Sequence, residues 1–289
     1  THAELDSFDR VVDQYEYRLN LVKEAMLSNN VQPTDLNAVV GRGGVLGPMP
    51  SGTYIVDEVL LAALYNSQVE HASNLGGIMA YHFGRELGIP AFIVDPVSVD
   101  EMVPEARLSG LPEIPRLSQG HALNMKAVAR KAAARLGKKY QDINLVVAHL
   151  GSGVSVTPHL RGKMIDVNNA NNEGPFSPER AGGLPASGLV KLCFSGGYTE
   201  RQMLDKLTRQ GGFYAYLGTK DSRKAEARAL QGDQEALLVL RAFVHQAAKE
   251  IGAMATVLYG KVDRIVLTGG MAHSAYITGE ISKRVGFIA

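Results

Sequence analysis

The chain has 289 residues, which is long enough for two α/β domains of ordinary size. Its 30 Lys and Arg residues nearly balance 29 Asp and Glu residues, so no positive surface charge points to nucleic acid or to an anionic membrane. The single cysteine, Cys193, excludes an internal disulfide framework and a cysteine zinc cluster, and no apolar run reaches membrane-spanning length. These features predict a cytoplasmic protein that acts on small molecules, with neither nucleic acid nor membrane as a partner.

The first part of the chain predicts a helix over 8–26, because its apolar residues recur at spacings of three and four. A short strand at 37–40 then leads into Gly41-Arg42-Gly43-Gly44. Ligands of open α/β sheets bind at the carboxyl ends of strands, where the guanidinium of Arg42 could hold a carboxylate or a phosphate. A solvated loop arginine fits the same pattern.

Three further polar residues of interest, His71, Asn74 and Asp95, follow along this part of the chain. A rigid loop at 47–52 precedes a helix at 56–65, and His71 and Asn74 enter a helical pattern at 78–87, where they either line a pocket or cap the helix start. Asp95 ends an apolar strand at 89–96. It is placed either to orient Mg²⁺ through water or to form a turn before proline.

A proline-containing surface excursion at 100–117 leads to an Ala-rich helix at 118–136 with a charged outer face, which we expect to be scaffold. The polar stretch 137–142 predicts a junction between two domains, 1–141 and 142–289.

A strand, a glycine-rich turn and a second strand at 145–156 are the most informative stretch. Gly151, Ser152 and Gly153 would expose backbone N–H groups to an anion such as phosphate, with His149 beside them. A hairpin turn that merely needs positive φ fits equally well. A further strand at 163–167 and a long loop at 168–185 follow, and that loop is too polar and too rich in glycine and proline to predict core.

The remaining pattern predicts helices at 187–194, 199–209, 222–231 and 233–259. Asp221 or Ser222, in a loop at 216–223, is placed to cap the third of these helices. A strand at 262–268 runs into Gly269 and Gly270 before a helix from about 273, an arrangement on which a nucleotide can lie against backbone. The apolar end, 286–289, predicts the beginning of a strand.

These motifs together resemble the butyrate kinases of the acetate kinase family along nearly the whole chain. The matching stretches are 40–44, 70–77, 92–97, 148–153, 165–170, 174–180, 216–219 and 267–270. The resemblance implies an α/β protein with the two-domain actin-like, ribonuclease-H-like fold of acetate kinase. It also implies reversible phosphoryl transfer between ATP and a short-chain carboxylate, butyrate or a branched-chain acid, which gives ADP and an acyl phosphate.

The resemblance further implies a role for individual side chains. Arg42 and Arg180 would clamp the carboxylate and the transferring phosphoryl group, and His149 would donate to a phosphoryl oxygen. Asp95 would act on Mg²⁺ indirectly, through water, while His71 and Asn74 line the acyl site. The residues implied for nucleotide binding are Gly151, Ser152, Gly153, Asp221, Arg223, Gly269 and Gly270. A homo-oligomer is also implied.

The sequence departs from the family pattern at both ends. It shows no counterpart of the family's first strands with their phosphate loop, or of its last strand and glutamate-containing segment, so we expect a fragment of the enzyme. Two alternatives remain open: an acetate or propionate kinase, whose acyl pocket differs in volume, and a regulator of the same fold that binds nucleotide without catalysis.

Overall fold

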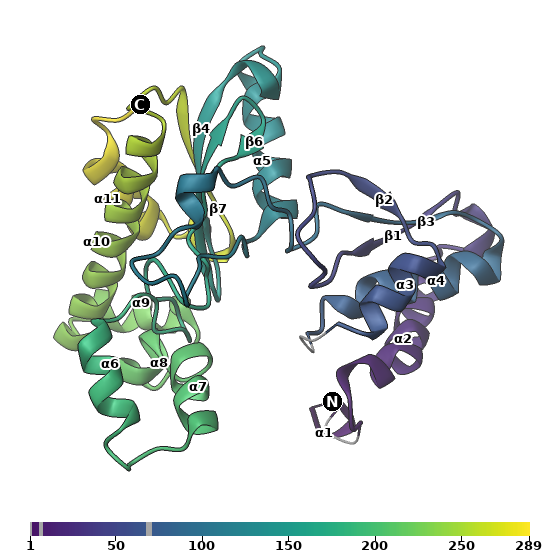
Figure 1. Ribbon diagram of the computed structural model, residues 1–289, viewed down its shortest axis with the longest axis horizontal. Helices are drawn as coiled ribbons and strands as arrows, with labels where there is room; N and C mark the ends of the chain where they lie inside the picture. Colours follow the sequence, from purple (N-terminus) through teal and green to yellow (C-terminus); the bar gives the residue numbers. More distant parts are fainter. Residues whose placement is uncertain (1, 6–7, 68–70) are drawn as a thin grey trace. The chain divides into compact units, whose positions relative to one another are not determined.

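The computed structural model describes residues 2–5, 8–67 and 71–289, so Glu70, in one of the matching motifs, lies outside the described residues. The chain forms two compact units, Thr1–Asp100 and Glu101–Ala289 (Figure 1). The division therefore falls well before the expected junction at 141 and 142. The helix at Ala122–Arg135 lies in the second unit because its apolar face packs on that unit's sheet.

The first unit is a small three-stranded sheet with helices. Its central strand β3 (Ala91–Val94) pairs in parallel with β1 (Val39–Arg42) and antiparallel with β2 (Thr53–Ile55). Helix α4 (Asn74–Leu87) packs on this sheet, and no side chain fits where Gly41 of β1 meets Gly76 of α4. The other helices of this unit are α1 (His2–Leu5), α2 (Tyr15–Ser28) and α3 (Glu58–Tyr65).

The second unit is built on a four-stranded sheet with the order β6-β5-β4-β7. Its strands are β4 (Asn144–Leu150), β5 (Val154–Leu160), β6 (Lys163–Met164) and β7 (Arg264–Thr268). The predicted hairpins are confirmed, because β5 is antiparallel to both β4 and β6, and β7 runs parallel to β4. The helices are α5 (Ala122–Arg135), α6 (Ala186–Cys193), α7 (Glu200–Thr208), α8 (Gly212–Leu217), α9 (Ser222–Leu230), α10 (Gln234–Val257) and α11 (Ala275–Val285).

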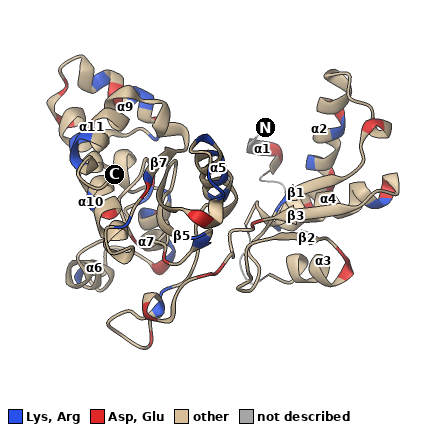
Figure 2. Cartoon of the chain, turned by 90° about the horizontal axis from the view of Figure 1, so that it is seen from above, with Lys and Arg blue, Asp and Glu red and all other residues tan. Residues whose placement is uncertain are grey.

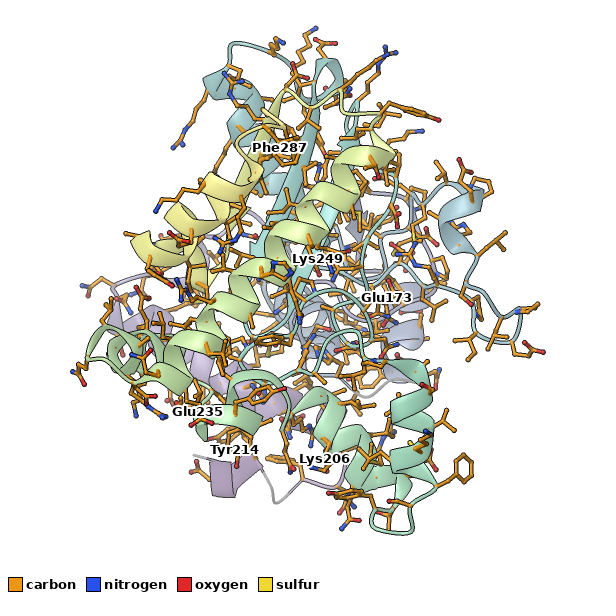
Figure 3. The ribbon with its side chains drawn as sticks, turned by 90° about the vertical axis from the view of Figure 1, so that its left-hand side faces the viewer. Glu173, Lys206, Tyr214, Glu235, Lys249 and Phe287 are labelled. Carbon is orange, nitrogen blue, oxygen red and sulfur yellow. The ribbon has the colours of Figure 1, made fainter. Side chains whose placement is uncertain are left out.

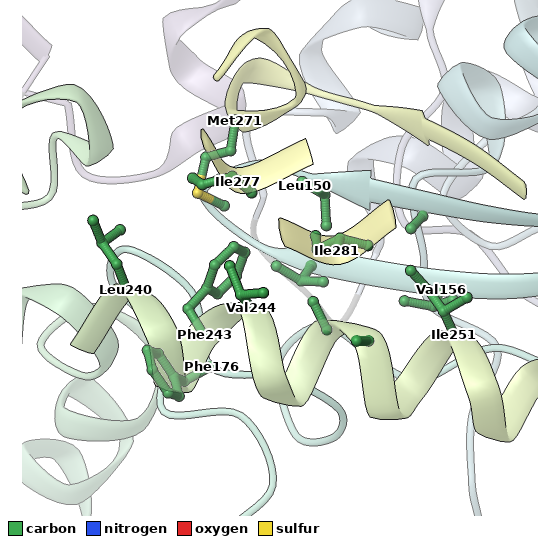
Figure 4. Packing of buried hydrophobic residues seen from close by; sticks show 14 of the residues in the cluster. Leu150, Val156, Phe176, Leu240, Phe243, Val244, Ile251, Met271, Ile277 and Ile281 are labelled. Carbon is green, nitrogen blue, oxygen red and sulfur yellow. The ribbon is translucent and has the colours of Figure 1, made fainter. Parts of the chain in front are cut away.

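Strand β4 is covered on both faces, which explains its continuous apolar sequence. Leu145 and Val147 pack against α5, while Val146, Ala148 and Leu150 belong to the core beneath α10 and α11 (Figure 4). Successive strand residues point to opposite faces. His149 therefore lies on the α5 side of the sheet, whereas α5 carries several exposed Lys and Arg residues, coloured blue in Figure 2.

Several sequence expectations are wrong in detail. Much of the loop at 168–185 is buried, because the Asn168 amide pairs with the backbone of β5 and the Phe176 ring packs against Phe213 and Phe243. Residues 286–289 form a turn rather than a strand. Strand β2 and helix α8 are too short to show a hydrophobic period. No helix in the described residues is long and apolar enough to cross a membrane.

A buried histidine lies at the other end of the second sheet. His159 of β5 has no solvent exposure, and its ring nitrogens lie 2.6 Å from the Tyr140 hydroxyl and 2.6 Å from Thr157 Oγ1. Burial, followed by the positive charges of Lys126 and Arg130, lowers the pKa of His159 to about 3. The side chain is thus held neutral in the folded protein.

This burial predicts acid sensitivity. The unfolded chain takes up a proton at His159 below pH 6.5 and the folded chain does not, so the stabilisation present above pH 6.5 is lost as the pH falls towards 3. Between pH 6.5 and 5.0 the loss from this group is about 2 kcal/mol in urea unfolding. His159→Gln is expected to show a shallower loss, and His273→Gln, at an exposed position, the wild-type loss. Equal slopes for wild type and His159→Gln would contradict this assignment.

Candidate active site

Three polar side chains form a row across the second sheet, at the carboxyl ends of β4 and β7. His149 of β4 is paired with Ser155 of β5 on one side and with Thr268 of β7 on the other. Directly paired residues of neighbouring strands share a face of the sheet. The apolar pattern of β4 thus places His149 at the edge where the predicted glycine-rich turn begins.

The start of α5 covers this row. The rings of His121 and His149 are stacked with centroids 3.8 Å apart and planes 9° apart, and His121 Nδ1 lies 3.0 Å from Ser155 Oγ. Asn124, in the first turn of α5, lies 2.8 Å from His149 Nδ1 through its Oδ1 atom. The helix expected to be scaffold therefore supplies two site residues that the sequence analysis missed. The signal was a pair of polar residues at the first turn of an otherwise Ala-rich helix.

The turn glycines leave room for two neighbouring side chains and do not adopt a left-handed backbone conformation. Neither Gly151 nor Gly153 has a positive φ, contrary to the simple hairpin-turn interpretation. A Cβ atom at Gly151 would lie 2.7 Å from His149 Nε2, and one at Gly153 would lie 2.5 Å from Arg180 Nη1. The turn is bare because an imidazole and a guanidinium occupy the positions that side chains would fill.

Arg180 is held against the turn by its own loop. Ser177 Oγ accepts from the backbone N–H of Arg180 and donates to the carbonyl of Ser152, which ties the loop to the turn. Arg180 Nη1 donates to the Ala170 carbonyl over 3.3 Å, while the buried Nε has no hydrogen-bond partner in the described residues. Burial lowers the pKa of Arg180, and Glu179 opposes that effect. A desolvated guanidinium with a donor to spare is suited to bind an oxyanion.

A pocket of about 460 Å³ opens beside the turn and gathers most of the residues predicted to bind nucleotide. Gly151 and Ser152 form one side, Asp221 and Arg223 another, and Gly270 a third. Lys220 adds a second cation to the lining. The pocket thus joins bare backbone, positive charge and the start of a helix, which are the features that hold phosphates.

Asp221, Gly269 and Gly270, all predicted to bind nucleotide, differ in their local contacts. Asp221 caps α9 by accepting from the Arg223 N–H and pairs with the Arg223 guanidinium, whose hydrogen bond lowers the pKa of Asp221 to about 2. Gly269 has φ +89°, and a Cβ there would lie 2.5 Å from the Leu150 carbonyl oxygen. Gly270, by contrast, faces open space within the pocket.

Arg42 and His71 meet in a separate pocket of the first unit, with a volume of about 370 Å³. Arg42 is exposed at the end of β1, and His71 lies just before α4 with its Nδ1 2.7 Å from Ser73 Oγ. The rest of the lining is largely apolar and includes Leu19, Val22, Val39, Val40, Met79, Ala80 and Phe83. The pocket offers a cation next to hydrocarbon.

Asn74 and Asp95 are buried and engaged with backbone. Asn74 Oδ1 accepts from the Val45 N–H over 2.7 Å, which shapes the loop after Arg42. Asp95, with φ +40°, accepts at Oδ1 from Ser51 Oγ over 2.6 Å and from the Gly52 N–H over 3.0 Å. Both side chains hold the loop between β1 and β2, Asn74 near its start at Val45 and Asp95 near its end at Ser51 and Gly52.

The described residues form no group of three or more His, Cys, Asp or Glu side chains able to hold a metal ion. Within that part of the chain, a protein-built metal cage therefore does not fit. Mg²⁺ commonly binds proteins through nucleotide phosphates, water and one or two carboxylates. The two cations and the bare turn of the 460 Å³ pocket fit a nucleotide without such a cage.

A further cavity, with a volume of about 770 Å³, contains none of the predicted site residues. It is lined mainly by leucines and other apolar groups of α6, α7, α8 and the start of α10. Lys206 and Glu235, which also line it, come from α7 and α10 respectively (Figure 3). Its apolar lining is unsuited to phosphate. The smaller 460 Å³ pocket, lined by exposed backbone and cations, is therefore the better candidate for a nucleotide site.

The chain has the α/β fold of the two-domain, actin-like kinases. A family model described as the acetokinase family matches residues 116–286, which is more than half of the chain. The chain belongs to the acetokinase family, whose members are carboxylate kinases that use ATP and ADP.

Three solved structures share the fold at low sequence identity. Acetate kinase from Porphyromonas gingivalis is 21% identical with a TM-score of 0.79, over 88% of this chain and 67% of that one. Propionate kinase from Francisella tularensis subsp. tularensis SCHU S4 is 22% identical with a TM-score of 0.77, over 93% and 72%. Acetate kinase from Entamoeba histolytica is 18% identical with a TM-score of 0.76, over 95% and 74%.

Proposed function

We propose that this chain carries the machinery of a kinase that transfers a phosphoryl group between ATP and butyrate or a branched short-chain acid. The proposal rests on one observation: His149 and Arg180 both lie against the glycine-rich turn at 151–153, beside the 460 Å³ pocket. Phosphoryl transfer needs positive charge and aligned donors around the transferring group, and little covalent chemistry from the protein. This cluster offers both.

Each group has a defined part in the proposed reaction. The 460 Å³ pocket holds the nucleotide, with its phosphates along the turn at Gly151, Ser152 and Gly153. Arg180 binds the oxygens of the transferring phosphoryl group, and His149 donates to one of them. Asp95, which is buried and accepts hydrogen bonds from Ser51 and Gly52, would act on Mg²⁺ only indirectly, through water. When bound with the nucleotide, Mg²⁺ neutralises phosphate charge.

The 370 Å³ pocket supports a short aliphatic acid as substrate. Arg42 supplies the partner for a carboxylate, and Met79 and Phe83 supply apolar wall for a chain of a few carbons. His71 lies at the same pocket, whereas the role of Asn74 is to hold the loop after Arg42. Acetate would leave more of this apolar surface uncovered than butyrate does, which favours the longer acids.

A hydroxamate assay for acyl phosphate with acetate, propionate, butyrate and isobutyrate tests the proposal. We expect the four-carbon acids to give the highest kcat/KM. Met79→Phe, which fills the pocket, is expected to lower kcat/KM for butyrate by about 5- to 150-fold, which corresponds to roughly 1–3 kcal/mol, and to spare acetate. Val59→Phe, on the exposed face of α3, is the matched control.

Absence of product with every acid, while ADP still binds, would support a non-catalytic nucleotide-binding regulator instead. A preference for acetate or propionate would assign the chain to those kinases.

A cytoplasmic location and a homo-oligomeric state remain predictions. Cell fractionation tests the first, and sedimentation of the purified chain tests the second.

A further inference from the structure

The ring of His149 is held at one nitrogen by α5. His149 Nδ1 lies 2.8 Å from Asn124 Oδ1, and Thr268 Oγ1 donates to the same amide oxygen over 3.1 Å. An amide oxygen can only accept hydrogen bonds, so the imidazole nitrogen facing it carries a proton. The contact therefore selects the Nδ1–H form of His149.

The surroundings also fix the orientation of the ring. His121 lies flat against it at 3.8 Å, and His121 is itself held by Ser155, so a rotation of the His149 ring would break the stack. With Nδ1 directed to Asn124, Nε2 is directed to the turn, where a Cβ on Gly151 would lie 2.7 Å away. The nitrogen that faces the phosphate-binding turn is thus the one without a proton in the neutral ring.

We propose that Asn124 is a positioning residue that holds His149 in the Nδ1–H form, so that binding of a phosphate at the turn is coupled to uptake of a proton by His149. The inference rests on the proposed function for the identity of the anion. A neutral Nε2 and a phosphate oxygen are both acceptors and repel one another. Once Nε2 takes a proton from solvent, the imidazolium donates to the oxygen, and Nδ1 continues to donate to Asn124.

The groups that face His149 come from all sides of the site. The start of α5 supplies His121 and Asn124, the neighbouring strands supply Ser155 and Thr268, and the loop supplies the Arg180 guanidinium across the turn. The ionisable groups in this set, His121 and Arg180, carry no negative charge. A bound phosphate therefore supplies the negative charge that stabilises an imidazolium at position 149.

The first test needs no ligand. NMR of the full chain labelled with ¹⁵N in histidine, with the signals of His149 assigned through His149→Gln, is expected to show Nδ1 protonated in the neutral ring. Asn124→Asp keeps the acceptor and adds negative charge, so His149 is expected to take up its second proton about one pH unit or more higher. Leu123→Ala, at the exposed neighbouring position, is the control and should behave as wild type. An Nε2–H form in the wild type would overturn the proposal.

The second test measures the coupling directly. ADP and pyrophosphate are titrated calorimetrically at pH 8 in two buffers of different ionisation enthalpy, where an ordinary histidine is neutral. We expect uptake approaching one proton in the wild type and in Leu123→Ala, little in His149→Gln, and less than wild type in Asn124→Asp. Equal uptake in wild type and His149→Gln would overturn the coupling. Failure of both ligands to bind would count against the nucleotide site, while the NMR result would still decide the role of Asn124.

Discussion

Arg180→Ala is expected to lower kcat for acyl phosphate formation by about 10²- to 10³-fold and to change the affinity for ADP little. The guanidinium lies against the turn at Gly153, one of its nitrogens donates to the Ala170 carbonyl, and its buried Nε has no hydrogen-bond partner in the described residues, so the group keeps a donor that its own loop does not use. Within the described part of the chain no carboxylate forms an ion pair with Arg180, so its removal leaves none of them unpaired. We therefore expect the unfolding free energy to stay close to that of the wild type.

Two comparisons make this result specific. Arg180→Lys keeps the charge and loses the paired donors, so an intermediate loss of kcat is expected. Arg209→Ala removes a largely exposed arginine that pairs only along its own helix with Asp205, and it should retain wild-type turnover. Wild-type kcat in Arg180→Ala would remove this residue from the proposed mechanism.

The second large effect is expected at the neighbouring glycines after β7. Gly269→Ala combines a left-handed backbone with a Cβ 2.5 Å from the Leu150 carbonyl oxygen, a backbone atom that cannot move aside without shifting β4. Urea unfolding is expected to show a loss of about 3 kcal/mol or more. Gly270→Ala meets nothing within 4 Å and should stay within about 0.5 kcal/mol of the wild type.

The same pair separates folding from binding. Gly270 lines the 460 Å³ pocket, so a larger residue there, as in Gly270→Leu, should weaken ADP binding at least tenfold without unfolding the chain. Calorimetric titration with ADP and a parallel urea melt measure the two effects. Unchanged ADP affinity in Gly270→Leu would place the nucleotide elsewhere, whereas equal stability of Gly269→Ala and wild type would contradict the close approach to Leu150.

The parts of the fold with a regular apolar pattern could be predicted from the sequence. Helix α10 carries apolar residues at helical spacing over many turns, and the strands β4 and β7 are largely apolar runs that glycine follows directly. β2 has only three residues and α8 only six, which is too few to reveal a period. The buried course of the loop at 168–185 depends on the amide of Asn168 replacing a strand partner, and composition does not reveal such a contact.

The site was predictable where chemistry lies next to a strand end, and not where tertiary packing creates it. His149 and Gly151 follow one apolar run and were found from the sequence. His121 and Asn124 lie some 25 residues earlier and reach the site only because α5 docks on the same face of β4. The alternative interpretation of the turn glycines, a hairpin turn that needs positive φ, is wrong, since Gly151 and Gly153 lie beside two side chains without adopting positive φ. Their binding of phosphate stays a prediction.

The double covering of β4 has a consequence for the two side chains proposed to be catalytic, His149 and Arg180. A strand paired on both edges and packed on both faces opens to solvent only when the whole unit unfolds, so its amide hydrogens belong to the most slowly exchanging class. His149 is carried at the end of that strand, and Arg180 is carried by a loop whose backbone is hydrogen-bonded to α7 and α8 and whose Phe176 ring lies in the same core. Both side chains are therefore expected to keep their positions until the unit unfolds, which sets the site for its substrates before they bind.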